Sequence, residues 1–240
     1  MCGISGFLNL SNAPVPNGIK SIKVMNNLQR HRGPDGSGEW IRSDALVGFG
    51  HQRLSIIDLS PSAVQPMTDE CGNWIVYNGE IYNYIELRKG LGEKEFRTAS
   101  DTEVLLRSYE RWGVACVERF RGMFSFAIWD ERKRMLFCAR DRFGIKPFYY
   151  ARVGDILYFA SEIKALLPFL PDIKTDIDGL KDYLTFQFCL DGKTLFEGVR
   201  ELPPAHILIV RNGELRVERY WEVYYRSEER RVGKECTIQC

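Results

Sequence analysis

Several features that would assign a function at once are missing from this sequence. No apolar run approaches the ~20 residues that a membrane-spanning helix requires. The 33 basic and 32 acidic residues leave a net charge of +1, which gives no electrostatic case for binding nucleic acid or an anionic membrane. No glycine-rich phosphate-binding motif is present either. We therefore expect neither a nucleic-acid-binding nor a membrane protein.

Metal-binding and disulfide patterns are also poorly represented. Histidine occurs only three times, so a histidine-based metal centre is not expected. The seven cysteines are scattered and contain no C-x-x-C pair, which suits free thiols in a reducing cytosol better than a disulfide framework or a zinc site. The first residues lack the basic and apolar regions of a secretory signal peptide. These patterns favour a cytoplasmic protein without a metal site.

A cysteine is present at the second position of the chain. Because its side chain is small, Met1 can be removed during maturation, and Cys2 would then carry both a thiol and a free α-amino group. The thiolate is the nucleophilic form of cysteine, and an α-amino group titrates near pH ~8, close enough to neutrality to act as a base. Cys2 is therefore a candidate nucleophile that supplies its own base. The alternative is a frayed terminus without a role.

The next residues argue against a frayed terminus. Residues 2–10 read CGISGFLNL, an apolar, glycine-spaced run that predicts a buried strand. A chain that begins directly with a core strand is held in place. The nucleophile hypothesis is therefore retained.

The composition and the apolar patterns indicate a mixed fold. Hydrophobic residues make up 45% of the 240 residues and charged residues 27%, as in a globular protein with one large domain or two small ones. We count eight to ten predicted strands and four to five helices, the latter including residues 19–30, 162–167 and 178–184. The strands come in runs rather than in strict alternation with helices. An α+β fold with helices covering the sheet faces is expected.

Arg53 interrupts an apolar stretch, residues 45–58, which predicts a strand that breaks into irregular chain near this position. A guanidinium group is costly to bury without an anionic partner. Two interpretations are about equally supported. One is an internal salt bridge, and the other is a clamp on the carboxylate of a substrate.

Asn78, Gly79 and Glu80 come directly after a predicted strand at residues 73–77. Asn-Gly is a strong hairpin signal, so a plain turn is one interpretation. Residues 81–87, however, resemble the start of a helix rather than a returning strand. A junction of strand, Asn-Gly-Glu and helix would present an amide side chain and a backbone N–H in one direction, which is how an oxyanion hole is built.

Residues 100–103 read SDTE and predict a capping box at the start of a helix, with Ser100 as N-cap and Glu103 at the third helical position. Gly113 can end this helix. Asp101 lies in the first turn, where the helix dipole favours a carboxylate. This is a sufficient structural reason for an aspartate, so the residues alone assign Asp101 no function.

The last residues do not continue these patterns. Residues 226–236 read RSEERRVGKEC, which lacks periodicity and resembles the translation of a common sequencing adapter. We expect residues 226–240 to be an artefactual tail that is not part of the fold.

Nine short motifs occur in order along the chain: MCGISGF, HRGPDG, GHQRLSIIDLS, QPM, YNGEIYNY, SDTEVLL, FRGMFSFAIWD, ARDRFGIKP and ASEIKALL. Together they closely resemble the N-terminal glutaminase domain of glutamine-hydrolysing asparagine synthetases, through nearly all of residues 1–167. Residues 176–220 resemble the segment that leads from that domain into the synthetase half. The resemblance implies a class II glutamine amidotransferase domain at residues 1–170 and a connecting segment at residues 171–225.

The resemblance also implies a fold and a mechanism. The fold would be an N-terminal-nucleophile hydrolase of four layers, α/β/β/α, with two antiparallel sheets. Cys2, freed of Met1, would attack the side-chain amide of L-glutamine, form a γ-glutamyl thioester and release ammonia. The side chain of Asn78 and the N–H of Gly79 would hold the oxyanion.

The glutamine site that the resemblance implies lies around Arg53, which would bind the substrate α-carboxylate. Asp101, together with Glu80, would bind the α-ammonium group. Main-chain groups of four further residues would line the pocket: Leu54, Ser55, Ile56 and Ile57.

The sequence departs from the family after this domain. Complete enzymes of the family continue into an ATP-dependent domain with an SGG-x-D-S loop, and no such loop occurs in these 240 residues. We therefore expect no ATP, magnesium or other cofactor here, and a missing synthetase domain as partner. The resemblance also leaves room for a homodimer of the full-length enzyme. Two alternatives stay open: a related amidotransferase with another ammonia acceptor, and a non-catalytic binding domain of the same fold.

Overall fold

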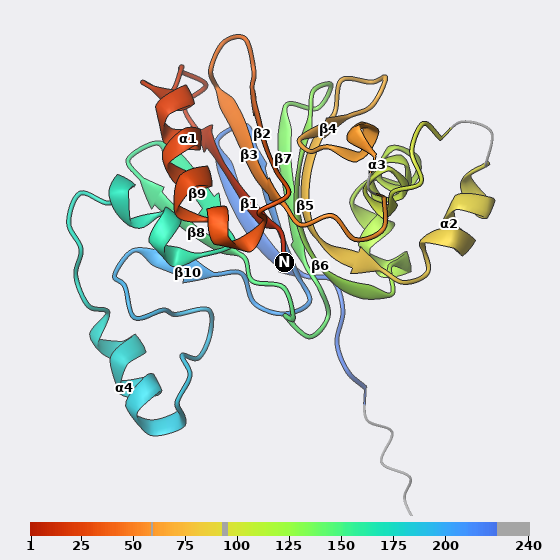
Figure 1. Cartoon of the computed structure of the whole chain (residues 1–240). Coiled ribbons are helices and arrows are strands. Elements are labelled where there is room, and N and C mark those ends of the chain that lie inside the picture. Colours follow the sequence, from red (N-terminus) through yellow and green to blue (C-terminus); the bar gives the residue numbers. More distant parts are fainter. Residues whose placement is uncertain (59, 93–95, 225–240) are drawn as a thin grey trace, which may run out of the picture.

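The computed structural model describes residues 1–58, 60–92 and 96–224, and within them the strands form two six-stranded sheets (Figure 1). The first sheet has the spatial order β10 (Val199–Glu201), β8 (Tyr149–Val153), β9 (Ile156–Ala160), β1 (Gly3–Asn9), β3 (Val47–Arg53) and β2 (Gly36–Ile41). The second has the order β12 (Glu214–Arg219), β11 (His206–Arg211), β7 (Met135–Arg140), β6 (Gly122–Asp130), β5 (Trp74–Ile81) and β4 (Met67–Thr68). All of these strand pairs are antiparallel.

Helices surround the two sheets. The α-helices are α1 (Gly18–Leu28), α2 (Tyr84–Leu91), α3 (Asp101–Trp112) and α4 (Ile177–Phe186). The 3-10 helices are η1 (Arg30–Arg32), η2 (Pro61–Ala63), η4 (Gly113–Arg119), η5 (Ile163–Ala165) and η6 (Leu167–Phe169).

Alternation along β1 explains why the first sheet is buried on both faces. Successive side chains of a strand point to opposite faces. Ile4 and Leu8 pack into the cluster between the two sheets, whereas Phe7 packs with Ile22 and Met25 of α1. The apolar run at the start of the chain is therefore a central strand, as predicted.

Side chains of β5 alternate in the same way between the two faces of the second sheet. Val76 lies in the cluster between the sheets, and its neighbours Ile75 and Tyr77 pack with Leu105 and other residues of α3. Helix α1 thus covers one sheet, and α2 and α3 lie over the other (Figure 1). The predicted four-layer α/β/β/α arrangement is confirmed.

Helix α3 begins and ends where the sequence predicts, but its capping differs in detail. The Ser100 hydroxyl accepts a 3.0 Å hydrogen bond from Thr102 N. Glu103 does not return a bond to Ser100 N, because its carboxylate accepts from the N–H groups of Arg97 and Thr98 instead. The predicted capping box is therefore wrong in its second half. Gly113 ends the helix with a φ of +59°.

Two further sequence expectations need correction. The described residues contain twelve strands rather than eight to ten. Residues 162–167, expected to form one helix, instead contain the short 3-10 helix η5 and the first residue of η6. Short edge strands and 3-10 turns carry few periodic side chains, so apolar periodicity detects them poorly.

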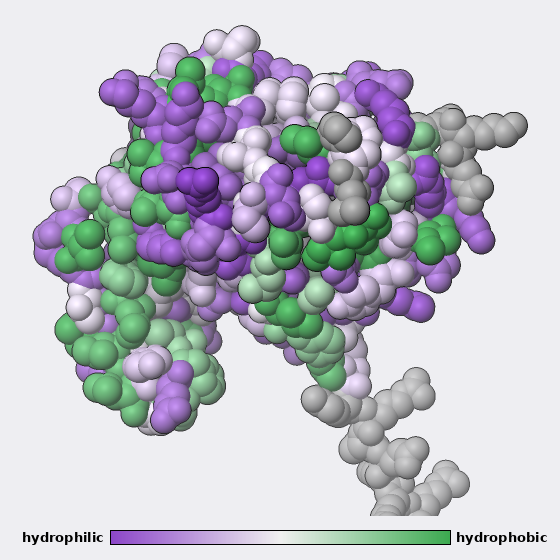
Figure 2. Space-filling view, viewed as in Figure 1, coloured by the Kyte–Doolittle hydropathy of each residue, from purple (hydrophilic) through white to green (hydrophobic). Residues whose placement is uncertain are grey.

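The segment after residue 170 contributes to both sheets. Strand β10 pairs with β8 at the edge of the first sheet, and β11 pairs with β7 in the second. Before β10 in the chain, α4 projects away from the sheets (Figure 1). It and the chain just after it carry a largely hydrophobic surface (Figure 2), made by the exposed side chains of Ile177, Tyr183, Leu184, Phe186 and Phe188. The expected boundary at residue 170 is thus not a boundary of the sheets. The expected tail, residues 226–240, lies outside the described residues.

Candidate active site

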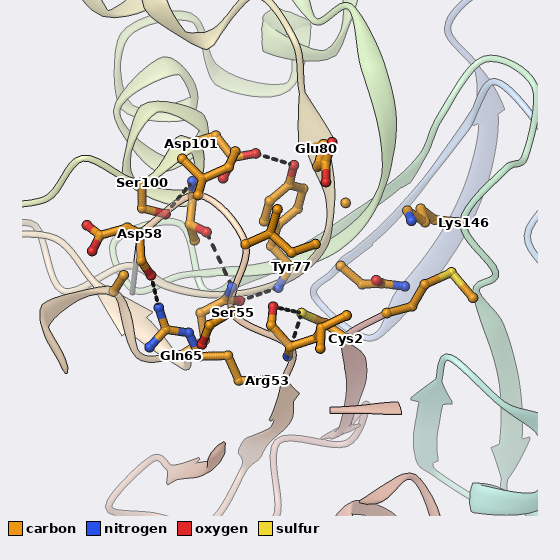
Figure 3. Close-up of a pocket in the computed structure, with 18 of the residues that line it drawn as sticks. Cys2, Arg53, Ser55, Asp58, Gln65, Tyr77, Glu80, Ser100, Asp101 and Lys146 are labelled. Atoms are coloured by element: carbon orange, nitrogen blue, oxygen red, sulfur yellow. Dashed lines mark hydrogen bonds between the residues drawn. The ribbon is translucent and has the colours of Figure 1, made fainter. Parts of the chain in front are cut away.

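A cavity of about 220 Å³ opens where the start of β1, the end of β3 and the second half of β5 meet (Figure 3). This is near the small end of ligand pockets, which hold ~300–1,000 Å³ for drug-sized ligands. The sequence-predicted site residues all line it: Cys2, Arg53, Leu54, Ser55, Ile56, Ile57, Asn78, Gly79, Glu80 and Asp101. Residues from four separate motifs therefore converge on one cavity.

The Cys2 thiol lies against the main chain just after β3. Its Sγ is 3.5 Å from Leu54 O, to which it donates, and 3.4 Å from Leu54 N, from which it accepts. Burial raises the pKa of the Cys2 thiol, and this effect is opposed by the Leu54 N–H and by positive charges at the N-terminus, Lys146 and Arg53. The thiol is thus protonated at rest and needs a base to become a nucleophile.

An arginine holds the first residues of the chain in place. Arg32 Nε donates a 2.9 Å hydrogen bond to Cys2 O, and its Nη1 pairs at 2.9 Å with Glu162. Glu162 also contacts His31 at 2.9 Å and Lys164 at 3.0 Å. The terminus is therefore fixed by the ladder of β1 and by this ion-pair cluster, which contradicts a frayed end.

Asn78 lies within β5 and is 1% exposed. Its amide nitrogen Nδ2 is buried and has no hydrogen-bond partner in the described part of the chain. An orphaned buried donor costs about 1–3 kcal/mol, so such a group in a cavity wall points to a bound acceptor. The predicted junction of strand, Asn-Gly-Glu and helix is wrong, because β5 continues to Ile81 and α2 begins only at Tyr84.

The backbone of Gly79 faces away from the neighbouring strand. Gly79 is paired in register with Phe124 of β6. On the other side of β6, Phe124 N donates to Asp141 Oδ2 and Phe124 O accepts from Asp141 N. In an antiparallel pair, the N–H and C=O of one residue point the same way. Gly79 and Phe124 are therefore a non-hydrogen-bonded pair, and the Gly79 N–H points away from β6.

The neighbours of Gly79 confirm the direction of its N–H. Two residues earlier, Tyr77 N donates to Gln65 Oε1, and two residues later, Ile81 N donates to Asp101 Oδ2. The N–H of Gly79 lies between these two on the same edge of β5. An added Cβ at this position would be 2.3 Å from Met123 O, so only glycine fits. The glycine is thus explained by the close approach of β6.

Asp101 is the first residue of α3 and is 5% exposed. Its Oδ2 accepts hydrogen bonds from Tyr77 Oη at 2.7 Å and from Ile81 N at 3.0 Å. Burial raises the pKa of Asp101, and these two hydrogen bonds oppose that rise. The carboxylate is therefore oriented from the side of β5 while it lines the cavity (Figure 3).

Arg53 ends β3 and also lines the cavity. Its guanidinium donates to main-chain carbonyls only, those of Ser60 at 3.1 Å and of Asp58. No carboxylate of the described residues pairs with it, so the internal salt bridge, one of the two interpretations of Arg53, is wrong. Between Arg53 and Asp58, Ser55 N donates to Asp35 Oδ2, which ties this cavity-lining segment to the loop before β2.

The sequence interpretation missed several cavity residues. Tyr77, Gln65 and Lys146 line the cavity and were assigned no role. Gln65 and Lys146 belong to the QPM and ARDRFGIKP motifs, which were the available signals. Further lining residues are Met1, Asp58, Ala63, Ser100, Thr102 and Met123.

Metal-ligating clusters and membrane-length helices are both absent from the described residues. No group of three or more His, Cys, Asp or Glu side chains is placed to hold a metal ion there. No helix in this part of the chain is long and apolar enough to cross a membrane.

Two stacked antiparallel sheets between helical layers, with a cysteine at the start of a central strand, define the N-terminal-nucleophile hydrolase fold. Among solved structures, a glutamine phosphoribosylpyrophosphate amidotransferase from B. subtilis matches with a TM-score of 0.67 and 19% identity, over 91% of this chain and 49% of that chain. The chain belongs to the glutamine amidotransferase domain family, whose model matches residues 1–221.

Curated relatives agree with this family. Asparagine synthetase 1 (glutamine-hydrolysing) of Bacillus subtilis strain 168 is 41% identical over 98% of this chain. An amidase, chry2, of Gibberella zeae is 39% identical over 94% of it. The chain spans only 38% and 35% of the lengths of these two relatives.

Proposed function

We propose that this chain hydrolyses L-glutamine to glutamate and ammonia, with Cys2 as the nucleophile. The observation that carries the proposal is the buried, unpartnered Nδ2 of Asn78 in the same cavity as the Cys2 thiol. A hydrogen-bond donor that is left unpaired beside a nucleophile is suited to an oxyanion that exists only during the reaction.

The first step requires a base close to the thiol. Removal of Met1, whose side chain is 56% exposed, would leave the α-amino group on Cys2 itself. That nitrogen accepts the thiol proton, and Sγ forms a bond to the side-chain carbonyl carbon of glutamine. The carbonyl oxygen becomes an oxyanion, to which Asn78 Nδ2 and Gly79 N–H donate hydrogen bonds.

The second step releases ammonia. The protonated α-amino group passes its proton to the amide nitrogen, the carbon–nitrogen bond breaks, and a γ-glutamyl thioester remains on Cys2. Water then attacks the thioester, gives a proton back to the α-amino group, and the carbon–sulfur bond breaks to release glutamate. The thiol is restored at the end of the cycle.

Recognition of the amino-acid end falls to charged groups away from the thiol. The guanidinium of Arg53 donates to main-chain carbonyls and pairs with no carboxylate of the described residues, and its planar fork suits a bidentate contact to the substrate α-carboxylate. Asp101, oriented by Tyr77, binds the α-ammonium group together with Glu80. Main-chain groups of residues 54–57 complete the wall.

The fate of the ammonia depends on a larger protein. We propose that the chain is the glutaminase part of an asparagine synthetase, in which an additional ATP- and magnesium-dependent domain amidates aspartate, and that the glutaminase step itself uses no cofactor. The relatives named as asparagine synthetases and the exposed apolar side chains of α4 support a partner domain. Other relatives are named as amidases, and the alternative function is a related amidotransferase with another ammonia acceptor.

A test of the chemistry is to trap the thioester. The full chain is mixed with glutamine, quenched in acid and analysed by intact mass. We expect a species that has lost Met1 and gained one γ-glutamyl group, and no such species for Cys2→Ala. Binding of glutamine without any covalent species would instead favour the non-catalytic binding domain.

A further inference from the structure

Lys146 is a buried cation in the candidate active site. It is 6% exposed, and it lines the cavity with Cys2, Asn78 and Met123. Its amino group has no hydrogen-bond or ion-pair partner among the described residues. Its ammonium group therefore reaches the cavity as a positive charge without a counter-ion in this part of the chain, and such a charge attracts negative charge in a cavity with low-dielectric walls. Such a group facing a cavity indicates that negative charge forms there.

The main chain around Lys146 is held firmly. Lys146 N donates a 3.0 Å hydrogen bond to Asp141 Oδ2, and Lys146 O accepts one of 2.9 Å from Arg140 Nε. Arg140 is itself buried and pairs at 2.8 Å with Glu201. The loop that carries Lys146 into the cavity is thus a built structure, fixed from two sides.

Lys146 lies on the opposite side of the thiol from the predicted α-carboxylate clamp. In Figure 3 the Cys2 sulfur lies between Arg53 and Lys146. A substrate held by Arg53 at its amino-acid end, with its amide carbon at Cys2, would therefore point its amide end towards Lys146. Negative charge develops at that end, first on sulfur and then on the carbonyl oxygen.

The charge balance around the thiol depends strongly on Lys146. The positively charged groups near Cys2 are the terminal amino group, Arg32, Arg53 and Lys146, and the acidic groups of the cavity are Asp58, Glu80 and Asp101. Arg53 lies at the substrate α-carboxylate in the proposed complex, which would neutralise it. Lys146 is then the cationic side chain of the cavity that remains for the reacting atoms.

We propose that Lys146 is an electrostatic partner of Cys2, whose ammonium group stabilises the thiolate and the anionic tetrahedral intermediate. This inference rests on the proposed function of Cys2 as nucleophile. No proton is taken from or given to Lys146, since the thiol proton goes to the α-amino group. Consistent with this placement, the charge of Lys146 lowers the pKa of the Cys2 thiol against the larger effect of burial.

The test measures the thiol directly, without glutamine. The full chain is alkylated with iodoacetamide across a pH series, and modification of Cys2 is followed by mass spectrometry of the amino-terminal peptide, because other cysteines also react. Lys146→Met should raise the apparent pKa of the thiol by about one unit and slow alkylation at neutral pH several-fold. Lys146→Arg retains the charge and should stay near wild type.

A matched control separates local charge from net charge. Lys133→Met removes one positive charge from the β6–β7 hairpin, where Lys133 pairs with Asp130 outside the cavity, and should leave Cys2 alkylation unchanged. If Lys146→Met does not fold, the uncharged polar variant Lys146→Gln replaces it in the same assay.

Two results would overturn the proposal. One is an unchanged pH profile of Cys2 alkylation in folded Lys146→Met or Lys146→Gln. The other is the same profile change in Lys146→Arg as in Lys146→Met, which would mean that only packing matters. Either result leaves glutamine hydrolysis by Cys2 untouched, whereas a wild-type chain without thioester would refute the proposed function instead.

Discussion

The hydroxyl of Tyr77 donates a 2.7 Å hydrogen bond to Oδ2 of Asp101, and this bond joins β5 to the first turn of α3 in the wall of the cavity. Burial of the phenol, together with the negative charge of Asp101, raises the pKa of Tyr77 well above its usual value, so the phenol stays a donor at any physiological pH. This neutral donor therefore orients the Asp101 carboxylate and favours its ionised form, against the larger effect of burial, which raises the pKa of Asp101.

Removing the Tyr77 hydroxyl should weaken glutamine binding and shift its pH dependence. The hydrogen bond favours ionised Asp101, so Tyr77→Phe raises the pKa of Asp101 further, and the acid limb of kcat/KM moves to higher pH. We expect KM to rise about tenfold with kcat little changed. Steady-state kinetics across pH would check this.

Tyr109→Phe is the matched control for this prediction. Tyr109 donates a comparable 2.6 Å hydrogen bond to Asp130, outside the cavity. The Tyr109→Phe variant should lower the free energy of unfolding but leave KM and the acid limb of kcat/KM unchanged. Equal effects of both variants on KM would contradict a role for Tyr77 in orienting Asp101.

Asn78→Ala tests the oxyanion hole. Loss of one donor to an oxyanion lowers kcat by about 10²–10³. KM should change little, because the interaction forms in the transition state. Asn83→Ala, which removes an amide side chain hydrogen-bonded to Arg119 and Arg121 outside the cavity, should keep kcat. An unchanged kcat in Asn78→Ala would exclude the role proposed for its orphaned nitrogen.

Gly79→Ala should destabilise the fold as well as the site. Its new Cβ would lie 2.3 Å from Met123 O and 2.7 Å from Phe124 Cα, so β5 and β6 must separate at a cost of about 3 kcal/mol. Gly90→Ala in α2 meets nothing within 4 Å and should stabilise by about 0.5–1 kcal/mol. Urea unfolding of both variants measures the difference, and equal stabilities would refute the close-approach argument.

The Glu162 cluster predicts loss of stability in acid. Burial acts to raise the pKa of Glu162, but hydrogen bonds from Arg32, Lys164 and His31 outweigh it and lower the pKa to about 2. The stabilisation is therefore present above the usual pKa of 4.5 and is lost as pH falls from there towards 2. After solvent screening it amounts to about 1 kcal/mol. Glu162→Gln should remove this part of the pH dependence, which denaturant unfolding at pH 3 and pH 6 would detect.

The sequence predicted the parts of the fold that leave strong periodic or capping signals. An apolar, glycine-spaced run identified β1, the apolar stretch at residues 45–58 identified β3, and Ser100 located the start of α3. The helix expected from residue 81 begins only at Tyr84, because β5 continues through Asn-Gly-Glu to Ile81. Pairing of Gly79 with Phe124 keeps that segment in β5, a tertiary contact that no local pattern reveals.

The sequence predicted the residues that line the candidate site but not the neighbouring side chains that orient or charge them. Ordered motifs brought Cys2, Arg53 and Asp101 together through resemblance, since their own residue patterns left each of them ambiguous. Tyr77 and Lys146 were missed because their roles depend on tertiary contacts: Tyr77 donates to Asp101, and Lys146 lines the same cavity as Cys2. The packing of the fold, and not the spacing of these residues in the sequence, brings them together.

The central claim is that Cys2 turns over glutamine, and the most direct measurement is the release of ammonia and glutamate from glutamine by the purified chain and by Cys2→Ala, with the N-terminus of each checked by intact mass. We predict that the wild type, with Met1 removed, releases both products in equal amounts and that Cys2→Ala releases neither. Turnover that survives in Cys2→Ala would contradict the mechanism.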